Sequence, residues 1–237
     1  MKTEEYFDAR ARGWTGLYIE DARFRRRFTL VTTFLDRVLP KKPGSLLDAG
    51  CGSGVFSRYL ASHGWKVTAI DASPEMIEEA RMSVGDNSIE YSVSTIEEFE
   101  AKPKSFDAIL SLSILEYVED DEAVIGKLIS LLAEGGVLVV SVPNRAGLLR
   151  KLEGLIFGIR SVTRDRVFGS RGEYLKYQKR QYSPFELDIM MRQFGLRKKR
   201  GIYVNSGFAG PSCLLPFFER RWWAAMYCAA YRRKYEL

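Results

Sequence analysis

The sequence is poor in the residues that build disulfide frameworks, metal sites and membrane spans. Its 237 residues include three cysteines and one histidine. The cysteines lie far apart without CxxC spacing, which argues against a disulfide scaffold and a zinc site and favours a reducing cytoplasm. No apolar run approaches the roughly 20 residues that span a bilayer, and the first ten residues lack the apolar core of a secretory signal. We therefore expect a cytoplasmic, single-domain globular protein without a metal.

Charge is distributed unevenly along the chain, although the net charge is only +6. Residues 1–143 contain 16 basic and 23 acidic residues, a net charge of −7, whereas residues 144–237 contain 20 and 7, a net charge of +13. Such asymmetry predicts that the two parts do different work. A solvated basic surface, an anionic membrane surface and an acidic substrate all fit the basic part. Nucleic acid fits less well, because the RRR and RKKR runs lack an accompanying RNA-binding domain.

Strand and helix patterns alternate along most of the chain. Expected helices cover 24–39, the stretch from the glycine-rich turn to 62, the region from 74, 121–132 (ended by Gly135-Gly136), 147–162 and the capped segment from 183. Expected strands cover 45–49, 66–70, 89–93, 106–111, 137–142 and 196–204. The tail at 225–231 fits either a helix or a strand, and we favour a strand because charge bounds it. This alternation predicts an α/β fold, a Rossmann-like seven-stranded, mostly parallel sheet that binds ligands beyond the carboxyl ends of its strands.

The segment LLDAGCGSG at 46–54 leads from an expected strand into an expected helix. Its glycines let the backbone bend tightly and approach a ligand, and taken alone the pattern also fits a dinucleotide. Asp48 precedes the first glycine by two residues, where it would repel a pyrophosphate and attract an ammonium group. Asp71 ends the second strand, where it can accept hydrogen bonds from ribose hydroxyls. Two acids around a glycine turn favour a cationic nucleoside without phosphates, and S-adenosylmethionine has that chemistry.

Four ordered segments resemble the motifs of class I S-adenosylmethionine-dependent methyltransferases over residues 45–144; they read LLDAGCGSGVFS, TAIDASPEMI, FDAILSLSILEYVED and LLAEGGVLVVSVPN. Within the class, Trp14 with the basic stretch 23–27, and Asn144-Arg145, resemble features of ubiquinone-biosynthesis O-methyltransferases. The opening YFDARARGWTGLYIED resembles the magnesium-protoporphyrin O-methyltransferase type. The resemblance implies one methyltransferase domain over 1–237. Its parts would be an N-terminal helical cover (1–40), a cofactor-binding core (41–145), a helical lid after strand five (146–182) and a C-terminal helix with strands (183–237).

The resemblance also implies where the cofactor contacts the chain. Asp48 and the glycine turn would line its methionine and sulfonium part, which the end of the fourth strand would also face, largely through its backbone. Asp71 would hold its ribose. The residues after the second strand would flank the ribose and adenine, and those after the third strand would border the adenine. A basic residue of the N-terminal cover would reach the cofactor as well. The implied cofactor-binding residues are Arg27, Asp48, Gly50, Cys51, Gly52, Asp71, Ala72, Met76, Ser94, Thr95, Ile96, Ser111 and Leu112.

The segment after the fourth strand departs from the ubiquinone relatives, which carry an acid and a Glu-His pair there. Here Ser113 replaces the acid and Tyr117 the histidine, while Glu116 remains. This departure puts histidine base catalysis and a divalent metal site in doubt. His63 closes the first core helix at the opposite end of the sheet, so we expect a structural role for it. The candidate catalytic residues are Glu116, Tyr117 and Asn144, with Tyr18 and Tyr182 as further substrate-side groups.

Methyl transfer needs an aligned nucleophile, a base for a hydroxyl acceptor and exclusion of water. We expect O-methylation of a small lipophilic or aromatic acceptor, with S-adenosylhomocysteine as the product. N-methylation of a small amine, methylation of RNA or protein, and cofactor binding without catalysis are the alternatives. The apolar stripe and marginal arginines of 147–162 are typical of an interfacial helix, which would add peripheral contact with an anionic membrane at its inner face. A plain packed helix is the alternative for that segment.

Overall fold

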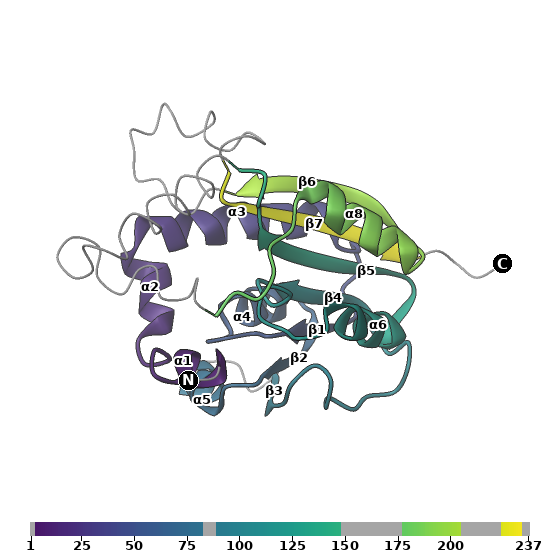
Figure 1. Ribbon diagram of the computed structural model, residues 1–237. Helices are drawn as coiled ribbons and strands as arrows, with labels where there is room; N and C mark the ends of the chain where they lie inside the picture. Colours follow the sequence, from purple (N-terminus) through teal and green to yellow (C-terminus); the bar gives the residue numbers. More distant parts are fainter. Residues whose placement is uncertain (1–2, 83–88, 148–176, 205–223, 234–237) are drawn as a thin grey trace.

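Seven strands form one sheet in the order β3-β2-β1-β4-β5-β7-β6 (Figure 1). The computed structural model describes residues 3–82, 89–147, 177–204 and 224–233. Strands β1 to β5 run parallel to one another, and β7 runs antiparallel to both of its neighbours, β5 and β6. This confirms the predicted seven-stranded, mostly parallel sheet. The strands are β1 (Ser45–Ala49), β2 (Lys66–Asp71), β3 (Glu90–Val93), β4 (Phe106–Leu112), β5 (Leu132–Pro143), β6 (Leu196–Val204) and β7 (Met226–Arg233).

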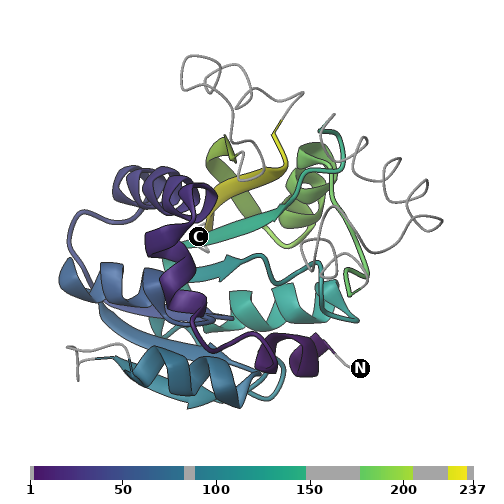
Figure 2. The same ribbon diagram turned by 90° about the vertical axis from the view of Figure 1, so that its left-hand side faces the viewer.

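Helices cover both faces of the sheet and form two apolar layers with it (Figure 2). One layer contains side chains of α3, α4 and α5, and the other contains side chains of α6 and α8. The central strands are therefore buried on both faces, which explains their unbroken apolar sequences. None of the described helices is both long and apolar enough to cross a bilayer. The helices are α1 (Thr3–Asp8), α2 (Trp14–Glu20), α3 (Ala22–Val38), α4 (Val55–Ser62), α5 (Pro74–Met82), α6 (Asp121–Leu131) and α8 (Pro184–Gln193).

The helix starts follow from capping residues that the sequence makes visible. The Ser73 hydroxyl accepts a hydrogen bond from the Met76 N–H (3.0 Å) at the start of α5. At the start of α8, Ser183 and Glu186 form a reciprocal capping box. Such contacts satisfy N–H groups that the first helical turn leaves without intrahelical partners. Both predicted starts, at 73–74 and at 183–184, are confirmed.

The glycine pair at 135–136 does not end a helix, as the sequence pattern predicted. Helix α6 already ends at Leu131, and both glycines lie inside β5. A Cβ atom on Gly136 would come within 2.8 Å of the Ala133 carbonyl oxygen and 3.1 Å of the Asp107 carbonyl oxygen. Glycine therefore permits a close approach of β5 to β4, near the point where their register shifts. The need for glycine at 136 comes from its contact with the neighbouring strand β4. The local sequence pattern does not show such a contact, and it therefore suggested a helix end instead.

The tail forms strand β7, which confirms the strand over the helix. Its residues 226–231 are buried, and Tyr227 and Tyr231 pack into the layer that contains α6 and α8. Residues 148–162 of the predicted helix at 147–162 lie outside the described residues. Of the predicted lid at 146–182, the structure describes only its first two residues and residues 177–182.

The carboxyl ends of β1, β2, β4 and β5 meet at one edge of the sheet, called here the carboxyl edge. Other parts of the chain also reach this edge. Asn144 follows β5, bridges to Tyr182 and donates its backbone N–H to the Ala225 carbonyl oxygen (2.9 Å). Helix α1 contacts α5, whose start follows β2 directly. The carboxyl edge therefore combines the glycine turn, the N-terminal helices and the residues just before β7.

Candidate functional site

The glycine turn after β1 adopts a backbone that glycine alone accommodates easily. Gly50, Gly52 and Gly54 all have positive φ angles, of 79°, 53° and 72°. A Cβ atom on Gly50 would lie 2.0 Å from Ile114 Cδ1, whereas one on Gly52 would meet nothing within 4 Å. The turn is thus packed closely at Gly50 and faces open space at Gly52. A ligand can approach the backbone at Gly52, as the sequence motif predicts.

The Asp71 carboxylate joins the end of β2 to the glycine turn. Its Oδ2 accepts a hydrogen bond from the Gly52 N–H (2.7 Å), and its Oδ1 accepts one from the Ser73 N–H (3.0 Å). Burial raises the pKa of Asp71 above its ordinary value, although these two hydrogen bonds act to lower it. Each carboxylate oxygen keeps a second lone pair. The side chain can therefore hold the turn and still accept hydrogen bonds from ligand hydroxyls.

Asp48 places a second carboxyl group beneath the turn, where it is only 2% exposed. The Ser57 hydroxyl donates a hydrogen bond to its Oδ2 (2.6 Å). Burial raises the pKa of Asp48 to about 6, with a contribution from the nearby charge of Asp71. Burial also raises the pKa of the Cys51 thiol well above its ordinary value, so this thiol is neutral. The buried acids would be stabilised by a positively charged ligand group, which fits the cofactor implied by the motifs.

The other cofactor-binding residues predicted around β2, β3 and β4 fall into two groups. Ala72 and Ser94 lie beside Asp71, because Ser94 donates its N–H to the Asp71 carbonyl oxygen (2.9 Å), and Thr95 follows Ser94. The second group lies in the core or close to it, and its contact with a cofactor stays a prediction. These residues are Met76, Ile96, Ser111 and Leu112.

Arg27 reaches the carboxyl edge from α3. Its Nη2 donates a hydrogen bond to the Ser113 hydroxyl (3.1 Å), which lies 3.3 Å from the Ser141 hydroxyl. Ser113 has a positive φ of 63°, which is uncommon for a residue other than glycine. The structure thus brings Arg27 to the ends of β4 and β5, while its predicted contact with the cofactor is untested.

The three candidate catalytic residues all lie at the carboxyl edge. Glu116 is 2% exposed, and its carbonyl oxygen accepts a hydrogen bond from the Lys179 N–H (2.8 Å). The Tyr117 ring packs edge-on against Phe7. Asn144 donates from Nδ2 to the Ala224 carbonyl oxygen (3.0 Å) and accepts the Ala146 N–H at Oδ1 (3.2 Å). Its amide therefore holds the ends of β5 and β7 together.

Tyr182 belongs to a hydrogen-bonded network that the sequence did not predict, in which Tyr182 and Asp121 are buried and Arg180 is exposed. Its hydroxyl donates a hydrogen bond to Asp121 Oδ2, and Arg180 donates from Nη1 to both oxygens of Asp121 (2.6 Å). Burial acts to raise the pKa of Asp121, but the hydrogen bonds from Tyr182 and Arg180 outweigh it and leave that pKa lowered. The network fastens residues 180–182 to the start of α6. Some 60 residues separate the partners in sequence, so no local signal indicates the contact.

Aromatic side chains of the N-terminal helices cover the carboxyl edge; the sequence analysis expected a helical cover there but did not identify its ring contacts with the segment after β4. Phe7 packs between Tyr117 and Trp14, with ring centroids 5.3 and 6.0 Å away. Asp8 anchors α1, because its carboxylate accepts a hydrogen bond from the Ser73 hydroxyl. Tyr18 packs edge-on against Phe24 and Phe28 of the cover and against Phe56 of α4. The density of aromatic residues in 6–28 was the available signal.

His63 lies apart from these groups, as predicted. It caps the end of α4, and its Nδ1 lies 2.7 Å from the Tyr59 carbonyl oxygen. No cluster of three histidine, cysteine or carboxylate side chains suited to a metal occurs in the described part of the chain.

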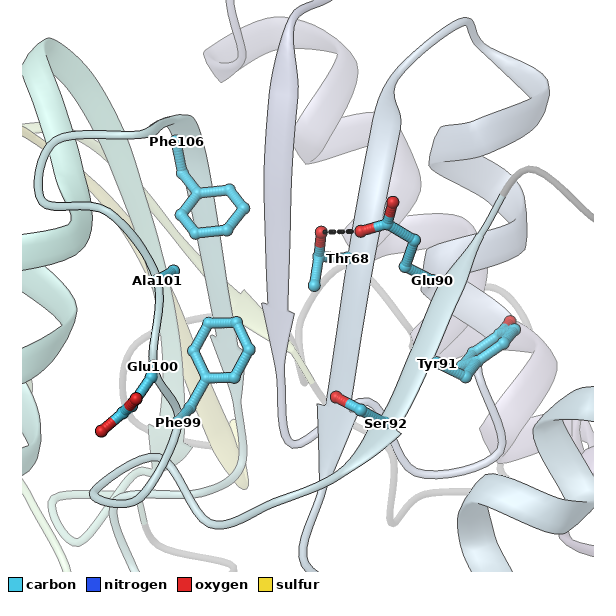
Figure 3. Close-up of a pocket in the computed structure, with 8 residues that line it drawn as sticks. All are labelled: Thr68, Glu90, Tyr91, Ser92, Phe99, Glu100, Ala101 and Phe106. Atoms are coloured by element: carbon cyan, nitrogen blue, oxygen red, sulfur yellow. Dashed lines mark hydrogen bonds between the residues drawn. The ribbon is translucent and has the colours of Figure 1, made fainter.

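A cavity of about 380 Å³ lies against β2 and β3 (Figure 3). Thr68, three residues before Asp71, donates a hydrogen bond there to Glu90 Oε2 (3.3 Å). The lining residues are Thr68, Glu90, Tyr91, Ser92, Phe99, Glu100, Ala101 and Phe106. None of the predicted site residues is among them.

Comparisons with known proteins agree with the motifs. A family model described as a methyltransferase domain matches residues 22–198. A ubiquinone biosynthesis O-methyltransferase of Xanthomonas campestris pv. campestris (strain B100) is 42% identical over 107 residues, which are 44% of this chain and 45% of that protein. The enzyme of the same name from Xylella fastidiosa (strain 9a5c) is 39% identical over 115 residues, 47% of each chain. The matched region thus spans less than half the length of these curated relatives.

Solved structures share the fold at low sequence identity. Magnesium protoporphyrin IX methyltransferase from Synechocystis PCC 6803, solved with bound S-adenosylhomocysteine, has a TM-score of 0.69 and 18% identity, covering 98% of each chain. A Haloferax volcanii putative methyltransferase, solved in complex with the Trm112 methyltransferase activator, has a TM-score of 0.72 and 17% identity, covering 97% of this chain and 98% of that one. These similarities support the fold.

Proposed function

Since the chain belongs to the methyltransferase-domain family, we propose that it transfers a methyl group from S-adenosylmethionine to a hydroxyl group of a small aromatic acceptor. The main support for this proposal is the glycine turn, which is open at Gly52 and flanked by the carboxyl groups of Asp48 and Asp71. This arrangement suits a cationic nucleoside. A pyrophosphate would meet two acids instead of the basic or neutral surroundings that it requires.

The two carboxyl groups suit two different parts of the cofactor. The free lone pairs of Asp71 would accept hydrogen bonds from the ribose hydroxyls. Asp48, buried beneath the turn, would stabilise the positive charge of the methionyl part. When bound, S-adenosylmethionine supplies a methyl carbon that is already activated by its sulfonium. The protein then has to align the acceptor oxygen with that carbon, take up the hydroxyl proton and exclude water.

The acceptor would lie between the N-terminal cover and the segment after β4. The rings of Phe7, Trp14 and Tyr117 gather there, and offset or edge-on contact with such rings favours an aromatic acceptor. Glu116, buried just after β4, is the proposed acceptor of the hydroxyl proton. The names of the ubiquinone O-methyltransferase relatives support oxygen as the methylated atom.

The test is a pair of measurements on the purified chain. Calorimetric titration with S-adenosylmethionine and S-adenosylhomocysteine should give micromolar binding. Transfer of a radiolabelled methyl group should then occur to phenol but not to aniline, its amine counterpart in the screen. Transfer to aniline alone would replace O-methylation by N-methylation. Cofactor binding without transfer to any acceptor in a panel of phenols, quinols, porphyrins and amines would support a binding protein instead.

A further inference from the structure

Arg58 reaches from the first turn of α4 back to the glycine turn from which this helix starts. Its Nη1 donates a hydrogen bond to the Ser53 carbonyl oxygen (2.9 Å) and a longer one to the Ala80 carbonyl oxygen near the end of α5 (3.3 Å). This nitrogen carries two hydrogens, so it can donate one to each carbonyl. The half-buried side chain of Arg58 therefore links the glycine turn to α5.

Two contacts thus join the glycine turn to the segment formed by β2 and α5. The first is the hydrogen bond from the Gly52 N–H to Asp71 (2.7 Å), and the second runs from Ser53 through Arg58 to Ala80. Asp71 is also expected to bind the ribose hydroxyls, whereas no residue of the second contact is among those expected to bind the cofactor. The Arg58 contact can therefore hold the turn whether or not a ligand occupies Asp71.

Tyr91 of β3 supports the same part of the turn. A Cβ atom on Gly54 would lie 2.5 Å from the Tyr91 hydroxyl oxygen, so this hydroxyl packs directly against Gly54. Burial raises the pKa of Tyr91 to about 12, and the charge of Arg58 acts to lower it, so a neutral phenol lies close to the guanidinium. The ring packs in the apolar layer that contains α3, α4 and α5. Arg58 and Tyr91 together limit the positions that Ser53 and Gly54 can take.

The turn depends on such contacts because its glycines do not fix their own backbone. Gly50, Gly52 and Gly54 have left-handed φ angles, and glycine loses more conformational freedom on ordering than any other residue. If the turn became ordered only when the ligand bound, that cost would reduce the affinity.

We propose that Arg58, supported by Tyr91, is a positioning residue that holds the glycine turn in the conformation that binds the cofactor. This inference rests on the proposed function, because S-adenosylmethionine is the proposed ligand of the turn. Arg58 acts through the backbone of Ser53 and does not itself contact the ligand.

The first measurement compares Arg58 with a second arginine that also donates to a backbone carbonyl. Arg81 of α5 donates to the Tyr91 carbonyl oxygen (2.6 Å), so it ties α5 to β3 rather than to the turn. Calorimetry on the full chain measures the affinity of R58M and R81M for S-adenosylhomocysteine, and urea unfolding measures their stability. We expect R58M to bind about fivefold more weakly than the unchanged protein and R81M to bind within about twofold of it. R58K keeps the charge and a donor and should recover part of the lost affinity.

A purely structural role of Arg58 would give a different result. R58M would then lose stability, but its folded form, titrated well below the unfolding temperature, would bind S-adenosylhomocysteine normally. Equal affinity of R58M and the unchanged protein, or equal losses of affinity in R58M and R81M, would overturn the proposal. If the unchanged protein did not bind S-adenosylhomocysteine at all, the proposed function would fail together with the positioning role, which is a distinct outcome.

A measurement without ligand separates positioning from direct contact with the cofactor. The Gly52 N–H is bonded to Asp71, and the Gly54 N–H is bonded to the Cys51 carbonyl oxygen (3.0 Å). Amide hydrogen exchange at these two glycines, followed by NMR, reports how often the turn opens. We expect both amides to exchange about fivefold faster in R58M than in R81M and the unchanged protein. Weaker binding by R58M with unchanged exchange would mean that Arg58 contacts the cofactor directly, and the positioning role would be wrong.

Tyr91 provides the test if R58M does not fold, as judged by its circular dichroism melting curve. Y91F removes only the hydroxyl oxygen that packs against Gly54. Y59F is the matched control, because the Tyr59 hydroxyl donates to Asp36 Oδ1 (2.8 Å) at an exposed position of α4. We expect Y91F to weaken S-adenosylhomocysteine binding about threefold and Y59F to leave it unchanged. Unchanged affinity in Y91F would overturn the proposal.

Discussion

The Asp71 carboxylate accepts a hydrogen bond from the backbone N–H of Gly52, 2.7 Å away, and so links the end of β2 to the glycine turn after β1. The same carboxylate is the group expected to hold the ribose of the cofactor. The conformation of the glycine turn and the binding of the cofactor ribose therefore both depend on the side chain of Asp71. The contact also explains why an acid at the end of β2 belongs with a glycine turn that lies about 20 residues earlier.

Asp71→Ala is expected to weaken S-adenosylhomocysteine binding more than tenfold. Loss of a charge-assisted hydrogen bond is worth roughly 1.5–3 kcal/mol, and the turn also loses an anchor. Calorimetry measures the effect. Glu90→Gln is the matched control, because Glu90 is an exposed acid on the neighbouring strand β3. Unchanged affinity in Asp71→Ala would show that the ribose is held elsewhere.

Gly52→Ala is expected to abolish cofactor binding while reducing the stability of the fold only modestly. The added methyl group meets no atom within 4 Å, but it enters the space where the ligand approaches, and φ is positive. We expect a stability loss of about 1–2 kcal/mol from the left-handed backbone together with loss of detectable cofactor binding. Urea unfolding and calorimetry on the same sample test the two parts. A variant that binds as tightly as the unchanged protein would mean that the cofactor does not contact this face of the turn.

The raised pKa of Asp48 should make the protein less stable as the pH rises. Burial raises its pKa to about 6 from the ordinary 3.8, so the folded state binds a proton more readily than the unfolded state does. The free energy of unfolding should therefore fall as the pH rises from about 4 to 6 and then level off. Two pKa units correspond to about 3 kcal/mol.

Asp48→Asn isolates this effect, because the amide cannot ionise and still offers an oxygen to Ser57. The difference in unfolding free energy between the two proteins, measured by urea titration at pH 4, 5, 6 and 7, should shift by about 3 kcal/mol in favour of Asp48→Asn. A difference that stays constant over this range would show that Asp48 titrates normally.

Asp121→Asn is expected to destabilise the protein by about 1–3 kcal/mol at pH 7, because Tyr182 and Arg180 lose a charged partner. The pKa of Asp121 is lowered in the folded state, so its contribution is present at neutral pH and lost as the pH falls through that value. Glu119→Gln serves as the control, because Glu119 pairs with Lys179 on the surface with 85% of its side chain exposed. Equal stability of Asp121→Asn and Glu119→Gln at pH 7 would show that the hydrogen bonds of Asp121 with Tyr182 and Arg180 do not stabilise the fold.

The predictable features of the chain were local ones. Apolar runs located the strands, and Ser73 and Ser183 marked helix starts because a capping residue acts within one turn. The glycine turn and its two acids were visible because they stand at the ends of successive strands. Gly136 was misread as a helix end, since its role depends on a contact with β4.

The less predictable features were contacts between distant parts of the chain. The Arg27–Ser113 hydrogen bond joins residues 86 positions apart, and Tyr182 meets Asp121 across 61. Nothing in the local pattern around Arg27 distinguishes it from the neighbouring arginines of α3. Only the packing of α3 against the sheet selects which of them reaches the carboxyl edge.

The most direct test of the central claim is a calorimetric titration of the unchanged protein with S-adenosylmethionine, with NADH as the competing ligand class. We predict micromolar binding of S-adenosylmethionine and no detectable binding of NADH, because the acids at the turn exclude a pyrophosphate. Binding of NADH in place of S-adenosylmethionine would contradict the assignment of the glycine turn and with it the proposed methyl transfer.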